Sequence, residues 1–245
     1  MVALVVGFKD NMNSVYQDLK ERVFKQNQRL IEKGLVVLTW GNVSEIDREK
    51  GVVAIKPSGV SFEKMKVEDI VIIDLNGNVI EGQLKPSSDT PTHLELYRCF
   101  PHIGGVCHTH ATYSVSFAQA KKPVIPYGTT HADSFYGIIP CTRELNKEEI
   151  NGDYELNTGK VIVEAFLNKD YEATPAVLVA SHGPFSWGKD AKAAVDNAII
   201  LEKICQMNLL TDILNPSHNT IDENLERKHH ERKHGVNAYY GQKGD

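Results

Sequence analysis

The hydrophobic and polar positions near the start of the chain follow a helical pattern. Between residues 14 and 34, apolar side chains recur every three or four positions, which is the spacing of one face of a helix. Ser14 can cap the start of such a helix, and Gly34 can end it. The pattern therefore predicts an amphipathic helix over 14–34.

Short apolar runs between polar turns come next. They predict strands at 35–38, 52–55 and 70–75, and Asn76-Gly77 favours a type I′ hairpin. The same two periodicities predict the remaining elements in the order helix 90–100, strand 105–110, helix 113–120, helix 158–168, strand 176–181, helix 191–207 and helix 221–234. This mixture of hairpins and helices predicts an α/β fold in which helices flank a central mixed or antiparallel sheet.

The domain organisation follows from what the sequence lacks. No internal repeat, low-complexity tract or long Gly/Ser linker divides the 245 residues, and one α/β domain can reach this length. We therefore expect a single domain over 14–242, preceded by an extension at 1–13 and followed by a tail at 243–245.

Charge and cysteine usage narrow the functional classes. The net charge of −5 provides no cationic field for a polyphosphate backbone, so nucleic acid is not expected as a partner. No apolar stretch reaches membrane-spanning length, and residues 1–8 lack the flanks of a signal peptide. The 4 cysteines form no CxxC pair, which suits reduced thiols. These features predict a soluble, cytoplasmic protein without a membrane partner.

Candidate metal ligands stand at the ends of two predicted strands. The period of two along a strand places His108 and His110 on the same face, so both imidazoles can point at one ion. His182 ends the second strand just before Gly-Pro and is the best third candidate, although a surface histidine is the alternative. Asp89, just before a predicted helix, can be a fourth ligand or an ordinary cap. Neutral histidines suit a catalytic cation that acts as a Lewis acid.

Two similar turns offer hydroxyls and backbone amides beside a lysine. They are Lys56-Pro57-Ser58-Gly59 and Lys85-Pro86-Ser87-Ser88, and Trp40-Gly41-Asn42 adds a third polar loop. Such a pair can hold a phosphate from two sides, but Pro-Ser-Gly is also a common turn without a ligand.

These motifs occur together with others further along the chain. The full set is Thr39-Trp40-Gly41-Asn42-Val43-Ser44, Lys56-Pro57-Ser58-Gly59, Lys85-Pro86-Ser87-Ser88-Asp89-Thr90-Pro91-Thr92-His93, His108-Thr109-His110, Gly128-Thr129-Thr130-His131-Ala132-Asp133, Ser181-His182-Gly183-Pro184 and Ala238-Tyr239-Tyr240-Gly241-Gln242. From about residue 19 to 242 the chain closely resembles the L-ribulose-5-phosphate 4-epimerase family, of the class II aldolase superfamily. The resemblance implies a class II aldolase-like three-layer fold.

The resemblance also implies roles for individual residues. One zinc ion per subunit would be held by His108, His110, His182 and, in the free enzyme, Asp89. The residues implied for substrate binding, chiefly of its phosphate, are Gly41, Asn42, Ser58, Gly59, Ser87 and Ser88. Asp133 and Tyr240 match the two acid/base groups, and the tyrosine would come from a neighbouring subunit of a ring-shaped (C4) homotetramer. Thr129, Glu155 and His229 match supporting positions.

The implied activity is that of an isomerase that interconverts L-ribulose 5-phosphate and D-xylulose 5-phosphate. Zinc would stabilise the enediolate formed when the C3–C4 bond breaks, and rotation of the retained aldehyde would invert C4 on re-addition. Pathways of arabinose or ascorbate breakdown both fit such an enzyme.

Two alternatives remain open. A class II aldolase acting on fuculose or rhamnulose phosphate would use the same chemistry but release the aldehyde; in those enzymes a glutamate stands where this chain has Asp89. A non-catalytic scaffold like the adducin head would share the fold without the chemistry. The three histidines and Tyr240 argue against the scaffold.

Overall fold

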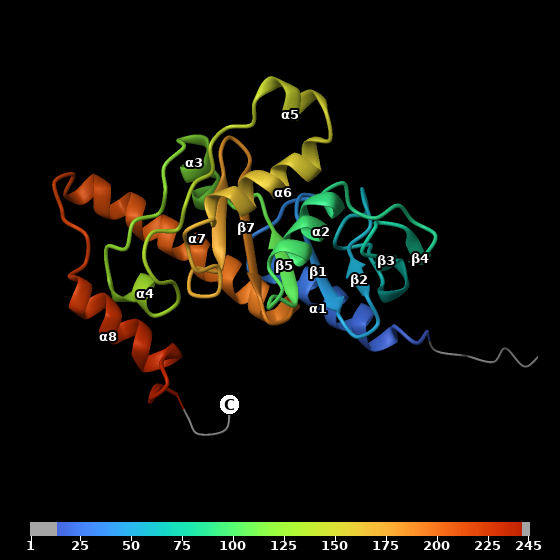
Figure 1. The fold of residues 1–245 in the computed structure, drawn as a ribbon, viewed down its shortest axis with the longest axis horizontal. Coiled ribbons are helices and arrows are strands. Elements are labelled where there is room, and N and C mark those ends of the chain that lie inside the picture. The colour runs from blue at the N-terminus through green and yellow to red at the C-terminus, as the bar shows by residue number, and fades with distance from the viewer. Residues whose placement is uncertain (1–13, 242–245) are drawn as a thin grey trace, which may run out of the picture.

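Within residues 14–241, which the computed structural model describes, seven strands form one sheet in the order β4-β3-β2-β1-β5-β7-β6 (Figure 1). Every neighbouring pair is antiparallel. The strands are β1 (Asn42–Asp47), β2 (Val52–Ile55), β3 (Val71–Asp74), β4 (Val79–Glu81), β5 (Gly105–His108), β6 (Ala176–Val179) and β7 (Gly183–Gly188). The predicted sheet is confirmed in its antiparallel form.

Helices cover both faces of the sheet. The helices of the described residues are α1 (Gln17–Glu32), α2 (Thr90–Cys99), α3 (Thr112–Gln119), α4 (Thr129–Ala132), α5 (Lys147–Asn151), α6 (Tyr154–Ala165), α7 (Ala191–Leu214) and α8 (Glu223–His234), with a short 3₁₀ turn at Val67–Asp69. Helices α1 and α7 pack on one face, and α2 and α6 pack on the other. Figure 1 shows α4 and α8 together at one end of the molecule, away from β2, β3 and β4 at the other end.

The three layers follow from the alternation of side chains along each strand. In β2, Val52 and Ala54 belong to the core beneath α1 and α7, whereas Val53 and Ile55 belong to the core beneath α2 and α6. All four residues are buried. A strand that is apolar on both faces needs a helical layer on each side, so the apolar run itself predicts the three-layer arrangement.

The prediction of a first strand at 35–38 is wrong. Residues 35–38 form no strand, and Leu38 has a positive φ of 56°, which breaks an extended run. The strand lies further on, as β1. Sequence patterns obscured β1 because it buries polar side chains with partners: Ser44 contacts His93 and Tyr97, and Glu45 accepts from Arg22.

Other elements differ at their ends. The hairpin at Asn76-Gly77 is present, but only Gly77 (φ 88°) has a positive φ, so the turn is not type I′. Gly183 and Pro184 begin β7 instead of only forming a turn, α6 begins four residues before the predicted Thr158, and α7 continues to Leu214. Helices α4 and α5 were not predicted, because each is too short to show a periodic pattern.

The proposed extension at 1–13 lies outside the described residues, as do residues 242–245, so the division into extension, domain and tail stays a prediction. No helix among the described residues is long and apolar enough to cross a lipid bilayer.

Candidate active site

Three histidines meet where β5 ends and β7 begins. His108 is the last residue of β5 and pairs in register with Asn42 of β1 and Phe185 of β7, while His182 lies in the turn between β6 and β7. Together with His110, these residues present ligand atoms that all lie within 4.8 Å of one another. The structure therefore brings the three predicted histidines together.

The hydrogen bonds of His108 show which of its nitrogens faces the cluster. Its Nδ1 lies 2.9 Å from the carbonyl oxygen of Pro184, and its Nε2 lies 3.1 Å from Nε2 of His110. A carbonyl only accepts, so Nδ1 carries the proton and Nε2 presents a lone pair. Burial lowers the pKa of His108 to about 3 and also lowers the pKa of His110 and His182. Neutral imidazoles that converge in this way fit a divalent cation.

Asp89 lies at the N-terminus of α2 and lines the same hollow, but it is not part of the group within 4.8 Å. Its Oδ2 accepts a hydrogen bond of 2.6 Å from the Asn42 amide. Burial opposes ionisation, yet His108, His93 and the Asn42 amide outweigh it and hold the pKa of Asp89 below its usual range. Asp89 is thus a carboxylate beside the histidines, and its role as fourth ligand stays a prediction.

The predicted substrate residues line one hollow with these groups. We call it the histidine cleft: it has a volume of about 430 Å³ and is lined by Thr39, Trp40, Gly41, Asn42, Lys56, Pro57, Ser58, Gly59, Ser87, Ser88, Asp89, His108, His110, Tyr154, Glu155 and His182. The six predicted substrate residues and Glu155 are all present. Three polar loops that are far apart in sequence therefore share one cleft.

The two similar turns are joined to each other. The amide of Ser58 donates to the carbonyl of Lys85, and the amide of Ser87 donates to the carbonyl of Lys56, at 2.9 and 3.0 Å. The sequence had suggested that the backbone amides of these turns could bind a phosphate. These two amides are already paired with carbonyl groups, so they are not free to do so. The pairing instead holds both turns side by side at the cleft.

Gly41 is required by its surroundings. Its φ is 97°, and a Cβ at this position would lie 2.7 Å from the carbonyl oxygen of His108. A glycine therefore allows the loop before β1 to approach β5 closely.

Sequence analysis did not assign Lys56 to the site. Its side chain is 2% exposed, lies over the Phe62 ring at 4.7 Å, and donates to the carbonyl oxygen of Val60 at 2.7 Å. Burial lowers its pKa to about 8, although Asp89 favours the charged form. The available signal was its position at the end of an apolar strand, directly before Pro-Ser-Gly. Tyr154 and Trp40 line the cleft as well and were also not assigned.

A family model for the class II aldolase and adducin N-terminal domain matches residues 21–209. The chain belongs to this family. An L-fuculose 1-phosphate aldolase of known structure is 27% identical, with a TM-score of 0.75 over 88% of this chain and 95% of that chain. The superfamily and the fold implied by the motifs are thus confirmed, whereas the narrower resemblance to L-ribulose-5-phosphate 4-epimerase stays a prediction.

Two further structures bear on the fold alone. L-fuculose 1-phosphate aldolase from Glaciozyma antarctica PI12 is 23% identical, with a TM-score of 0.71 and coverage of 88% of this chain and 81% of that chain. A sugar-phosphate aldolase from Thermotoga maritima is 23% identical, with a TM-score of 0.62 and coverage of 83% and 97%.

The expected enzyme class requires correction. We expected an isomerase, but the similar structures are named as aldolases, which are lyases. The physical reason is that aldol cleavage and epimerisation by way of such cleavage can use the same metal and phosphate groups, so motifs that build the cleft do not by themselves imply inversion of a carbon.

The other predicted site residues lie elsewhere. Asp133 caps the end of α4 and accepts from Arg232 (3.0 and 2.7 Å) and His229 (3.0 Å) of α8. Burial acts to raise the pKa of Asp133, but these hydrogen bonds and the charge of Lys233 outweigh it and lower the pKa. The ring of Tyr240 lies 4.9 Å from the Arg232 guanidinium and 4.4 Å from Lys233 Nζ.

We call Asp133, His229, Arg232, Lys233 and Tyr240 the α8 cluster. None of them lines the histidine cleft, and neither does Thr129, the first residue of α4. The structure thus divides the predicted site residues into two groups within one chain.

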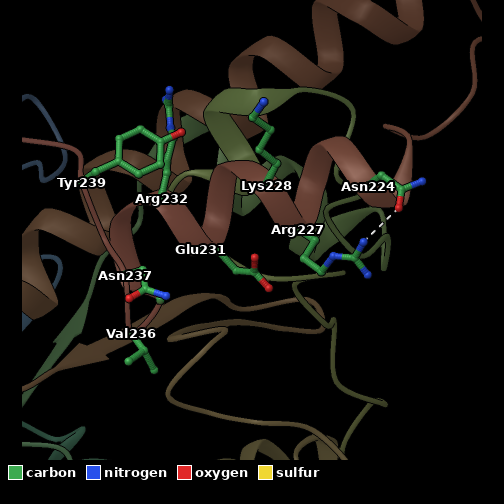
Figure 2. A pocket seen from close by; sticks show the side chains of 9 residues that line it. Asn224, Arg227, Lys228, Glu231, Arg232, Val236, Asn237 and Tyr239 are labelled. Carbon is green, nitrogen blue, oxygen red and sulfur yellow. Dashed lines mark hydrogen bonds between the residues drawn. The ribbon is translucent and has the colours of Figure 1, made fainter.

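A further hollow of about 780 Å³ runs along α8 (Figure 2). Lys228 and Arg232 extend to one side of the helix in this view, and Arg227, which donates to Asn224 at 3.0 Å, extends to the other. None of the predicted site residues lines this hollow. It belongs to the basic surface of α8 and not to the histidine cleft.

Proposed function

We propose that this protein is an enzyme that cleaves and forms a carbon–carbon bond of a phosphorylated ketose with the help of a divalent metal. The histidine ligands favour zinc as this metal. The observation that carries the proposal is that three neutral imidazoles lie in one cleft with a candidate phosphate site. That site consists of the two hydrogen-bonded turns 56–59 and 85–88 and the buried side chain of Lys56. The name of a similar protein, L-fuculose 1-phosphate aldolase, supports a sugar phosphate as substrate.

In this proposal the chain itself binds and orients the substrate. Lys56 and the hydroxyls of Ser58 and Ser87 hold the phosphate, since charge-assisted hydrogen bonds are the strong ones. Asn42 is fixed by Ser87 at 3.0 Å and by Asp89, so its amide is oriented before substrate arrives. The phosphate grip and the histidines then determine which carbon–carbon bond lies at the reacting position.

The metal, when bound by His108, His110, His182 and Asp89, would supply Lewis-acid stabilisation of the negative charge that develops as the bond breaks. Proton transfer to and from the hydroxyl of the cleaved carbon falls to Asp133 and Tyr240. Because both lie in the α8 cluster, outside the cleft of their own chain, we propose that a second copy brings them to the cleft. A ring-shaped homotetramer would satisfy this requirement for every cleft.

Two fates of the aldehyde fragment distinguish two activities. Release gives the lyase reaction, which the named similar structures favour. Retention followed by re-addition would instead be the epimerase reaction that the motifs resemble, with L-ribulose 5-phosphate as substrate. The bond that breaks can be the same in both, so one assay can follow both products.

The test is incubation of the purified protein with L-fuculose 1-phosphate, L-rhamnulose 1-phosphate and L-ribulose 5-phosphate, with and without chelator and added Zn²⁺. We expect a free aldehyde from at least one substrate and loss of this product in chelator. Formation of D-xylulose 5-phosphate without free aldehyde would contradict release while retaining bond cleavage. No turnover of any substrate by protein that holds no metal would contradict the proposal and favour a scaffold.

A further inference from the structure

Tyr154 is the first residue of α6 and lies beside the third histidine of the cleft. Its Oη is 3.4 Å from Nδ1 of His182, and the two ring centroids are 6.3 Å apart with an angle of 30° between the ring planes. Tyr154 also lines the histidine cleft. The Tyr154 hydroxyl therefore lies beside Nδ1 of His182 and leaves the other ring nitrogen, Nε2, available for a cation.

The Tyr154 contact bears on which ring nitrogen of His182 carries the proton. A neutral imidazole carries its proton on one nitrogen and offers a lone pair at the other. If Nδ1–H donates to the Tyr154 oxygen, Nε2 is left to face the cluster. His108 shows the same arrangement, because its Nδ1 is tied to Pro184 and its Nε2 faces His110. A phenol oxygen can accept a hydrogen bond, so Tyr154 can accept from Nδ1–H of His182 as the Pro184 carbonyl accepts from His108.

The position of Tyr154 is fixed by the packing of α6 on α2. A Cβ at Gly159 of α6 would lie 2.7 Å from Cβ of Glu95, so the two helices approach closely. Thr92 of α2 donates its hydroxyl to the carbonyl of Glu155. Because α2 begins directly after Asp89, the same packing positions both Asp89 and Tyr154 at the cleft.

We propose that Tyr154 is a positioning residue that holds His182 in the tautomer and orientation that present Nε2 to a bound cation. This inference rests on the proposed function only in that it requires the three histidines to bind a metal. Partners of this kind, which hydrogen-bond the far nitrogen of a ligating histidine, contribute about 10–100-fold to metal affinity.

The first test compares Tyr154→Phe with a matched control, Tyr113→Phe, whose hydroxyl accepts from Gln206 at 3.2 Å and which does not line the cleft. Affinity for Zn²⁺ is measured by competition with a chromophoric chelator. We expect about 10–100-fold weaker binding in Tyr154→Phe and unchanged binding in the control. Equal affinity in both variants and the wild type would overturn the positioning role.

The second test reads the His182 tautomer in the wild type itself and uses a variant only to assign the signal. Nitrogen-15 spectra of the metal-free wild type, with the His182 signal assigned by its loss in His182→Gln, report which ring nitrogen carries the proton. We expect the proton on Nδ1, and a proton on Nε2 would overturn the inference. Wild type that binds no Zn²⁺ but shows the expected tautomer would instead contradict the proposed function.

Discussion

The histidine cleft and the α8 cluster are built in different ways. The cleft is formed where β1, β5 and β7 meet, and the strand register fixes Asn42 next to His108. The α8 cluster is held by ion pairs between Asp133 and one helix at the end of the molecule (Figure 1). Tyr240 is 60% exposed there, whereas His108 is 1% exposed.

This difference shows which part of the candidate site a single chain builds by itself. The cleft contains candidate metal ligands and candidate phosphate-binding side chains, and the sheet and α2 determine their positions. The α8 cluster contains charged and exposed groups whose partners within the chain satisfy Asp133 but leave the aromatic ring open to solvent. We therefore expect changes in the cleft to alter metal and substrate binding, and changes in the α8 cluster to alter turnover with the metal retained.

The largest expected effect is that of His110→Ala. This variant should lose both bound metal and activity, because two remaining imidazoles hold zinc poorly. His110 is exposed, so the fold should persist, and an unchanged circular dichroism spectrum is the control. The checks are metal analysis after gel filtration and the aldehyde assay. A fully metallated variant would refute the ligand assignment.

Tyr240→Phe tests the other region, the α8 cluster. Phenylalanine keeps the ring that Arg232 and Lys233 cover, and only the hydroxyl is lost. We expect metal content to stay unchanged and kcat to fall by about 10²–10⁴-fold, as loss of an acid/base group typically causes. Tyr239→Phe, at the neighbouring exposed position, is the matched control. Near-normal turnover of Tyr240→Phe would discard the assignment.

Mixing these variants sharpens the comparison further. His110→Ala retains an intact α8 cluster, and Tyr240→Phe retains an intact cleft. If a second copy completes each site, subunits exchanged between the two inactive proteins should restore part of the activity. Absence of recovery in a sample shown to contain mixed oligomers would contradict sharing between subunits.

Much of this division follows from the sequence, and the reasons for the rest are physical. Strand periodicity placed His108 and His110 on one face, and the end of the next apolar run supplied His182. Strand β1 was not predicted, because Ser44 and Glu45 are polar and polar residues are expected at the surface. They are buried here because other residues hydrogen-bond to them. No local pattern could show that Asp133 contacts α8, since that contact joins segments about a hundred positions apart.

Lys56 also escaped assignment, because exposed lysines at strand ends are common and burial is a property of the tertiary structure. Its burial predicts a specific pH dependence. The pKa of about 8 means that the ammonium is charged below this pH and neutral above it. The affinity of the cleft for a phosphorylated sugar should therefore fall as pH rises through about 8.

Lys56→Met tests this dependence. Loss of charge-assisted hydrogen bonds of about 1.5–3 kcal/mol corresponds to roughly 10–100-fold weaker binding, measured as KM or by calorimetry with inorganic phosphate. The variant should also lose the change in affinity near pH 8, with metal content equal to that of the wild type. A variant that keeps the same pH profile would assign the titration to another group.

The smallest expected effect comes from a matched pair of glycines, one in each region. Gly41 beside the cleft and Gly241 next to the α8 cluster both have a φ of 97°, but a Cβ meets the His108 carbonyl oxygen at 2.7 Å in the first and nothing within 4 Å in the second. Alanine at either position adds about 1–2 kcal/mol of backbone strain. At Gly241 this strain should relax locally, because no neighbouring atom restricts the added Cβ.

At Gly41 the clash cannot relax without moving β1 from β5, so we expect Gly41→Ala to lower Tm by several degrees, at about 2–4 °C per kcal/mol for a chain of this size. Gly241→Ala should leave Tm unchanged within about one degree, since only its local strain remains. Thermal unfolding followed by circular dichroism measures both values. Equal Tm losses would show that the α8 end is packed as tightly as the cleft, and the contrast between the two regions would then be wrong.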